Sequence, residues 1–177
     1  LGLTPKRVPA KRNRLQQLTD IVDAVQRSDA TVRIGIVGKY FQTGEFVLAD
    51  SYISVIEALK HAAWHFQAKP ELVWLDAEAY EHDPAQLEEL ASFDGVLIPG
   101  GFGSRGIEGK IAAIEYVRTH NIPYFGLCYG MQLAAVEVAR NVAGLTGAHT
   151  VEIDENPEHP IVVVNPHQQK NISTKKY

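Results

Sequence analysis

Four short apolar runs, each followed by a helical pattern, constrain the fold of this chain more than any other feature of its sequence. The runs span residues 31–38, 71–75, 94–98 and 122–127, and a later apolar run covers 161–164. Short apolar runs of this kind suit strands that are buried on both faces of a parallel sheet. Strands that alternate with helices predict an α/β fold with a mainly parallel sheet flanked by helices.

Apolar residues three and four positions apart predict the helices between these runs. The predicted apolar stripes lie at Leu15, Leu18, Val22 and Val25, at Ile53, Ile56, Leu59 and Ala63 as an inner face, and at Ile107, Ile111, Ile114 and Val117, and two more helices span Ala85–Ala91 and Met131–Val142. Asp50 or Ser51 is expected to cap the second of these helices. Asp83 and Pro84 are expected to open the acidic one, with the proline at its first position.

The composition bounds the class of protein. A chain of 177 residues that is 45% hydrophobic and 21% charged has the size and make-up of one globular domain. Its net charge of -4 argues against nucleic acid as the main partner. One cysteine leaves no internal disulfide and fits a reducing cytoplasm. No apolar run approaches the roughly 20 residues of a membrane span, so we expect no membrane partner.

The single cysteine lies in the segment Gly126-Leu127-Cys128-Tyr129-Gly130, between an apolar run and a helical pattern. A nucleophile with glycines two positions away on each side is the nucleophile-elbow pattern. Such a turn lifts the sulfur out of the sheet and places it at a helix N-terminus, where the helix dipole favours the thiolate. A buried structural cysteine is the competing interpretation, and the flanking glycines count against it.

A second loop, Pro99-Gly100-Gly101-Phe102-Gly103, follows the apolar run one βα unit earlier. Adjacent glycines after a strand can turn backbone N–H groups toward an anion. Together with the N–H of Tyr129, such donors could stabilise the oxyanion of a tetrahedral intermediate. A tight turn and a phosphate-binding loop are the other interpretations of this segment.

Taken together, these two loops resemble those of the class I (triad) glutamine amidotransferases. The chain is most similar to the CTP synthase family through four features: Gly38-Lys39-Tyr40, residues 50–59, residues 100–110 and Glu152. The resemblance covers about residues 32–165 and implies a flavodoxin-like fold. It also implies that residues 1–30 are a linker and connecting helix from a synthetase domain, and that 31–177 is an amidotransferase domain incomplete at its C-terminus.

The resemblance implies chemical roles for the matching positions. Cys128 is expected to attack the side-chain amide of glutamine and form a glutamyl thioester. The N–H groups of Gly101 and Tyr129 are expected to hold the oxyanion. The family usually has leucine after the nucleophile, and the larger ring of Tyr129 is expected to narrow the glutamine pocket.

The resemblance also implies the ligands and partners. The residues expected to contact glutamine are Gly100, Phe102, Gln132 and Glu152, and Arg105 corresponds to an arginine linked to activation by GTP. No metal and no cofactor are expected in this domain. ATP and Mg²⁺ are expected in the synthetase domain, which aminates UTP to CTP, and the full-length protein is expected to be a cytoplasmic homo-oligomer, a tetramer.

The family's general base is a histidine in a His-Pro-Glu segment far downstream, and the sequence ends before such a segment. Glu158-His159-Pro160 has these residue types in the wrong order and is expected to precede the last strand, and His149 and His167 have no carboxylate at the right offset. Ammonia needs a proton to leave. We therefore expect this piece of chain to have little or no glutaminase turnover.

Other functions fit parts of the same pattern. One is the amidotransferase part of another synthetase, such as the one that makes GMP, and Arg105 and Asp50-Ser51-Tyr52 count against it. Another is a stress sensor or chaperone with a cysteine on an elbow, which would not be expected to carry the Pro99–Gly103 loop or Gln132. A non-catalytic binding module is the third. A glutamine analogue that alkylates Cys128 separates these alternatives from the amidotransferases.

Overall fold

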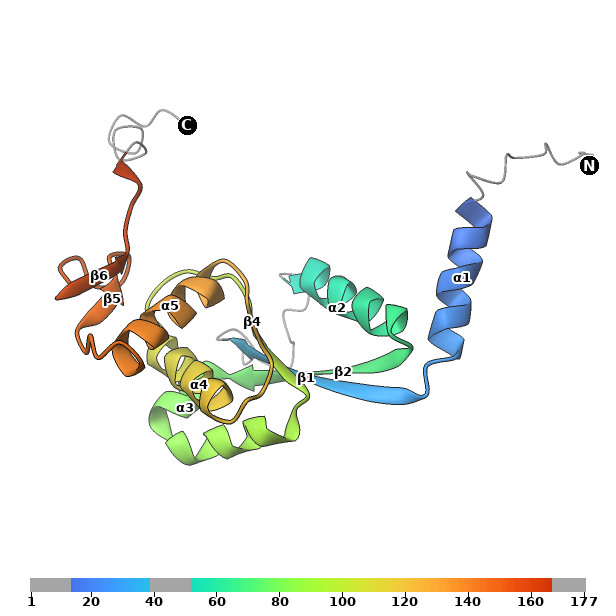
Figure 1. Cartoon of the computed structure of the whole chain (residues 1–177), viewed down its shortest axis with the longest axis horizontal. Coiled ribbons are helices and arrows are strands. Elements are labelled where there is room, and N and C mark those ends of the chain that lie inside the picture. The colour runs from blue at the N-terminus through green and yellow to red at the C-terminus, as the bar shows by residue number, and fades with distance from the viewer. Residues whose placement is uncertain (1–13, 39–51, 167–177) are drawn as a thin grey trace, which may run out of the picture. The chain divides into compact units, whose positions relative to one another are not determined.

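Four strands form one sheet in the order β2-β1-β3-β4 (Figure 1). Their bounds are Ala30–Gly38 for β1, Ala68–Asp76 for β2, Gly95–Ile98 for β3 and Tyr124–Gly126 for β4. β3 pairs in parallel with both β1 and β4, with Leu97 opposite Ile36 and Phe125. This order is that of flavodoxin-like doubly wound sheets, which confirms the predicted fold class. The loops that follow β3 and β4 therefore leave the same edge of the sheet side by side.

The computed structural model describes residues 14–38 and 52–166. The predicted cap at Asp50 or Ser51, the loop between Tyr40 and Asp50, and His167 lie outside these ranges. The chain divides into two compact units, one within Leu1–Val32 and Ser54–Glu71 and the other within Arg33–Ile53 and Leu72–Tyr177. The first unit holds helix α1 and nearly all of α2. The second holds the loops with the candidate chemistry.

The helices largely follow the predicted patterns. They are α1 Arg14–Gln26, α2 Ile53–His65, α3 Ala77–His82, the 3₁₀ helix η3 Pro84–Ser92, α4 Ile107–Thr119 and α5 Tyr129–Asn141, and a small second sheet pairs β5 Ala148–Thr150 with β6 His159–Val162 in parallel. All four predicted inner residues of α4 are at most 4% exposed. Ile53 is 53% exposed, so its assignment to an inner face is wrong. It is the first residue of α2, so its side chain lies at the end of the helix.

The acidic helix predicted from Ala85 to Ala91 is a 3₁₀ helix. Asp83 caps it as expected, because its side chain accepts a hydrogen bond from the N–H of Ala85, and Pro84 stands at its start. A proline at the first position suits either type of helix, so sequence did not separate them. β6 begins at His159, so the prediction that this histidine precedes the last strand is also wrong.

Helix α3 was not predicted from the sequence, and one of its side chains caps the N-terminus of α4. Gly106 at the N-cap of α4 has a φ of 69° and no side chain with which to cap the helix. Oε1 of Glu81 on α3 instead accepts hydrogen bonds from the N–H groups of Glu108 at 3.0 Å and Gly109 at 3.3 Å. A carboxylate in this position satisfies free N–H groups and complements the helix dipole.

Replacing Glu81 with alanine is expected to destabilise the protein by about 1 kcal/mol, which is the usual contribution of an N-terminal cap. Chemical denaturation followed by circular dichroism would measure the loss. Glu81→Gln keeps an acceptor oxygen and serves as the control, which should recover part of the difference. Equal stabilities of the wild type and Glu81→Ala would show that water replaces this cap.

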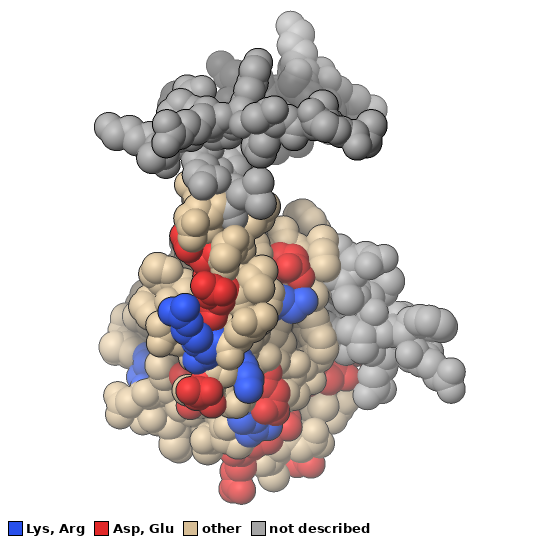
Figure 2. Space-filling model, turned by 90° about the vertical axis from the view of Figure 1, so that its right-hand side faces the viewer, with Lys and Arg blue, Asp and Glu red and all other residues tan. Residues whose placement is uncertain are grey.

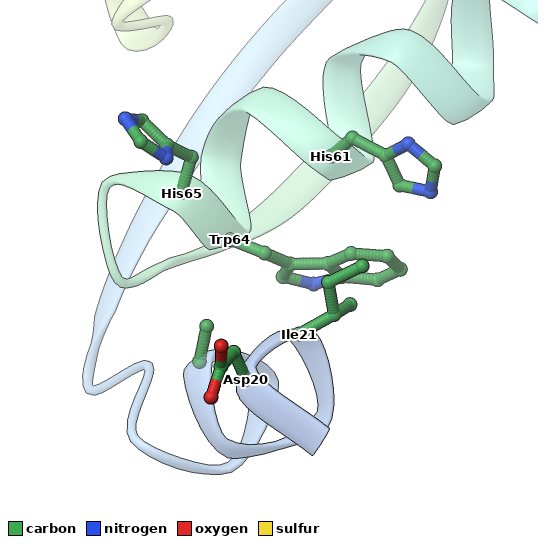
Figure 3. A pocket seen from close by; sticks show the side chains of 6 residues that line it. Asp20, Ile21, His61, Trp64 and His65 are labelled. Atoms are coloured by element: carbon green, nitrogen blue, oxygen red, sulfur yellow. The ribbon is translucent and has the colours of Figure 1, made fainter. Parts of the chain in front are cut away.

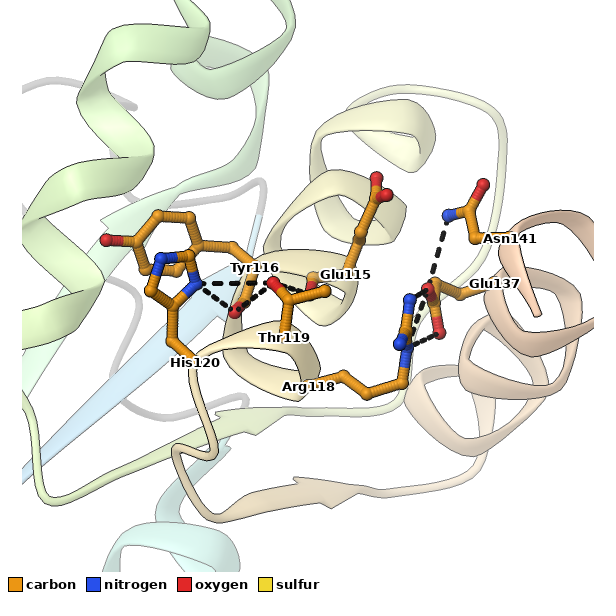
Figure 4. A network of polar contacts seen from close by, with 7 residues as sticks. All are labelled: Glu115, Tyr116, Arg118, Thr119, His120, Glu137 and Asn141. Atoms are coloured by element: carbon orange, nitrogen blue, oxygen red, sulfur yellow. Dashed lines mark hydrogen bonds and ion pairs between the residues drawn. The ribbon is translucent and has the colours of Figure 1, made fainter.

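An ion pair between the exposed Arg118 and the buried Glu137 joins α4 to α5 (Figure 4). The guanidinium of Arg118 donates three hydrogen bonds of 2.7 to 3.0 Å to the carboxylate of Glu137, whose side chain is completely buried. Asn141 donates a further hydrogen bond to the same carboxylate. The pKa of Arg118 is raised, first by this hydrogen bonding, so the guanidinium stays charged. The ion pair thus fixes α5, the helix that follows Cys128, against α4.

Charges of both signs are mixed on the described surface. On the face seen in Figure 2, the Lys and Arg side chains are interspersed with Asp and Glu. This face therefore lacks the one-sided positive field that attracts nucleic acid. Within residues 14–38 and 52–166, no helix has the length and apolar character needed to cross a bilayer.

Candidate active site

Cys128 occupies a strained turn between β4 and α5. It is the N-cap of α5, with φ 49° and ψ −102°, and it is exposed. A positive φ is uncommon for any residue with a β-carbon, and it is the backbone signature of a nucleophile elbow. The N–H of Leu127 bonds to the carbonyl of Ile98 at 2.9 Å, which fastens the start of the turn to β3. The thiol therefore stands at the strand-to-helix turn, as the sequence predicted.

Both glycines of the elbow are required by close backbone contacts. A β-carbon at Gly126 would lie 2.6 Å from the backbone of Gly130 and Met131. A β-carbon at Gly130 would lie 2.2 Å from the carbonyl oxygen of Ile98. The hydroxyl of Tyr124 adds a hydrogen bond of 2.8 Å to the carbonyl of Gly130. The pattern found in the sequence thus has a steric reason at each end.

The glycine loop after β3 lies beside the cysteine. A β-carbon built on Gly100 would be 3.5 Å from the Cβ of Cys128, and one on Gly101 would have no neighbour within 4 Å. The loop therefore lies next to Cys128 at Gly100, and the space beside Gly101 is not filled by other atoms. The N–H of Tyr129 is the first of α5 and has no partner within the helix. The structure brings together the nucleophile and both segments that were predicted to supply oxyanion donors.

The side chain of Tyr129 points into the interior. It is 2% exposed, and its hydroxyl donates a hydrogen bond of 3.3 Å to the carbonyl of Gly103. The ammonium of Lys110, itself 3% exposed, lies 5.7 Å from the centre of its ring. The ring therefore lines no open space beside the sulfur, contrary to the prediction that it narrows the pocket.

Two further predicted residues lie on the elbow side of the fold. Gln132 is in the first turn of α5, and its N–H bonds to the carbonyl of Cys128 at 3.1 Å. Glu152 is exposed in the turn after β5, and its N–H bonds to the hydroxyl of Thr150. Burial raises the pKa of Tyr129 to about 12, and the negative charge of Glu152 adds to this rise.

The remaining predicted residues lie on the outer part of the glycine loop. The side chain of Phe102 is 78% exposed. Arg105 is 71% exposed and forms an ion pair of 2.8 Å with Glu78 of α3. An exposed pair of this type is weak and is easily exchanged for another anion. The side chains of Phe102 and Arg105 are thus accessible to a ligand.

Two of the described histidines, His149 and His159, each lie near a carboxylate. His149 accepts a hydrogen bond at Nδ1 from the N–H of Thr150, and its Nε2 lies 3.7 Å from Glu108, so a carboxylate distant in sequence accompanies it. Burial, followed by the charge of Arg140, lowers the pKa of His149. His159 lies 3.8 Å from the carboxylate of its neighbour Glu158. No hydrogen bond between either ring and Cys128 is present in the described part of the chain.

A cavity of about 310 Å³ lies in the first unit, between α1 and α2 (Figure 3). Asp20, Ile21 and Ala24 of α1 and His61, Trp64 and His65 of α2 line it. The Trp64 ring projects toward Ile21. None of these residues was predicted to have a chemical role, and Cys128 is not among them. The candidate chemistry belongs to the second unit.

Comparison with known proteins places the chain in a family. The model of the family described as glutamine amidotransferase class-I matches residues 47–176. A CTP synthase of Methanococcoides burtonii is 49% identical over 150 residues, which are 85% of this chain and 27% of that protein. One of Sulfurisphaera tokodaii is 44% identical over 170 residues, which are 96% of this chain and 31% of that protein. The chain spans less than a third of the length of these curated relatives.

A solved structure agrees with the sequence relatives. It is the glutaminase domain of Trypanosoma brucei CTPS with bound acivicin. The match has a TM-score of 0.71 and 37% sequence identity, and it covers 78% of this chain and 52% of that one. The family model covers the elbow, the glycine loop and the strands that position them. The chain belongs to the class I glutamine amidotransferase family.

Proposed function

We propose that this chain is the glutaminase part of a CTP synthase, in which Cys128 attacks glutamine to release ammonia, and that this piece of chain by itself has little or no turnover. One observation carries the proposal: an exposed thiol stands on a strained elbow beside the glycine loop, where a β-carbon built on Gly100 would lie 3.5 Å from the Cβ of Cys128. A sensor cysteine needs no backbone cradle. An acyl-transfer enzyme does, because its intermediate develops negative charge on an oxygen next to the nucleophile.

The proposed reaction has two steps. The Cys128 thiolate attacks the side-chain amide carbon of glutamine, and the N–H groups of Gly101 and Tyr129 stabilise the oxyanion. The C–N bond then breaks, and the nitrogen leaves as ammonia with a proton that the family's downstream histidine would supply. Water hydrolyses the glutamyl thioester to glutamate and frees the thiol. The elbow and the glycine loop supply the nucleophile and the oxyanion donors in this scheme.

The ligands follow from the same proposal. Glutamine is expected to be held by Gly100, Phe102, Gln132 and Glu152, and exposed Arg105 to contact the activator GTP. The ammonia would be used by a synthetase domain that aminates UTP with ATP and Mg²⁺. The similarity to CTP synthases over most of this chain supports this assignment. We propose a cytoplasmic homo-oligomer, a tetramer, for the full-length protein.

Labelling by acivicin tests the proposal, since the structural relative holds that compound in its glutaminase domain. We expect one adduct on Cys128, which is the single cysteine of the sequence, so intact-protein mass spectrometry would be sufficient. An excess of glutamine should slow the labelling, and Cys128→Ser should abolish it. Reaction of Cys128 with iodoacetamide but not with acivicin would favour a sensor cysteine instead.

A further inference from the structure

Two tyrosine hydroxyls reach carbonyl groups of the glycine loop. Tyr52 donates a hydrogen bond of 3.4 Å to the carbonyl of Gly100, and Tyr129 donates one of 3.3 Å to the carbonyl of Gly103. The two side chains come from segments more than 70 positions apart, the residue before α2 and the first residue of α5. Together they bracket the part of the loop that contains Gly101.

The hydrogen bond from Tyr52 determines more than the position of one carbonyl. A trans peptide unit is planar, so the carbonyl of Gly100 and the N–H of Gly101 belong to one rigid group and point in opposite directions. The hydroxyl that holds the Gly100 oxygen therefore also sets the direction of the Gly101 N–H. That N–H is the proposed donor to the oxyanion.

The space around the β-carbon position of Gly101 is open, so packing there does not fix this peptide unit. A β-carbon at Gly101 would touch nothing within 4 Å, so side-chain packing does not restrain the residue. Glycine populates both signs of φ with similar ease, and an unrestrained glycine pair can rotate its shared peptide. A side-chain donor on the carbonyl would select one of these orientations before substrate binds.

Both hydroxyls are mounted on anchored rings. The Tyr129 ring is buried, and its raised pKa of about 12 keeps the phenolic proton in place at neutral pH. The Tyr52 ring is half-buried, and its centre lies 6.0 Å from that of Trp74 on β2. Each ring can thus act as a rigid support for a donor.

We propose that Tyr52 and Tyr129 are positioning residues of the oxyanion hole. Tyr52 orients the N–H of Gly101. The hydroxyl of Tyr129 ties Gly103, at the far end of the loop, to the elbow, and the backbone N–H of Tyr129 is the first N–H of α5. This inference rests on the proposed glutaminase function. The inference gives a role to the tyrosine after the nucleophile: its ring is buried, and its hydroxyl donates a hydrogen bond to the carbonyl of Gly103 in the glycine loop.

Removal of each hydroxyl without change of the ring tests the inference. In Tyr52→Phe and Tyr129→Phe, we expect alkylation of Cys128 by a diazo-ketone analogue of glutamine to slow about tenfold, less than the loss of a whole oxyanion donor. The ketone oxygen of that analogue takes the place of the amide oxygen. The rate with iodoacetamide, which needs no oxyanion hole, should be unchanged in both variants.

The matched control is Tyr80→Phe. Tyr80 is 1% exposed, and its hydroxyl donates to Glu89, so the change removes a buried tyrosine hydrogen bond in the same unit but away from the loop. Its diazo-ketone rate should equal that of the wild type. Equal rates in all three variants would overturn the inference, as would a parallel loss with iodoacetamide, which would indicate a merely structural role. If the wild-type chain itself reacted with iodoacetamide and not with the diazo-ketone, the proposed function would fail, and the inference with it.

Discussion

Gly130→Ala is expected to destabilise the protein by at least about 3 kcal/mol and to prevent labelling of Cys128 by glutamine analogues. The new methyl group would lie 2.2 Å from the carbonyl oxygen of Ile98 and 3.0 Å from its carbonyl carbon and Cβ. That oxygen also accepts the hydrogen bond from Leu127 that begins the elbow. Neither β3 nor the start of α5 can yield without breaking this bond.

Alanine is the better helix former, which opposes the expected loss. Its higher helix propensity is worth about 1 kcal/mol over glycine, which is smaller than the cost of the backbone clash. Urea denaturation would measure the net effect. Gly101→Ala is the control, because its β-carbon would meet no atom within 4 Å, and it should unfold at a similar urea concentration to the wild type. A Gly130→Ala variant within about 1 kcal/mol of the wild type would show that the elbow relaxes around a methyl group.

Much of the fold could be predicted because its strands and helices leave visible patterns in the sequence. Parallel strands need buried apolar runs, and the helix that returns from each strand needs an apolar stripe, so both periods are visible in the sequence. Ile107, Ile111, Ile114 and Val117 form such a stripe, and all are buried in α4. The nucleophile loop was visible because Gly126 and Gly130 meet backbone, where no other residue fits.

The elements that sequence missed are too short to show a period. α3 has six residues and β5 has three. Tertiary contacts position them: Glu81 of α3 binds the start of α4, and the side chain of Arg140 donates to the carbonyl of Ala148 in β5. Such contacts join residues that are 8 to 27 positions apart, and no local pattern reports them.

Within the site, the direction of side chains could not be predicted. The motif placed Tyr129 beside the nucleophile, but the hydroxyl bond to Gly103 depends on packing against α4. One signal was present in the sequence: Lys110 interrupts the apolar stripe between Ile107 and Ile111. A cation on an inner helical face needs a nearby polar or aromatic group, and the ring of Tyr129 is one of its neighbours.

Arg118→Met is expected to lower the thermal unfolding midpoint by roughly 5–10 °C, because it leaves the Glu137 carboxylate inside the protein with the amide of Asn141 as its hydrogen-bond donor among the residues drawn in Figure 4. The double variant Arg118→Met/Glu137→Met should recover at least half of the loss, since the buried charge is then gone as well and two apolar side chains fill the space. Glu137→Met alone should cost less than Arg118→Met, because the side chain of Arg118 is 36% exposed and water can solvate its charge. Differential scanning calorimetry of the three variants measures this order. If the double variant were no more stable than Arg118→Met, the contact between α4 and α5 would depend on the shape of the two side chains and not on their charges.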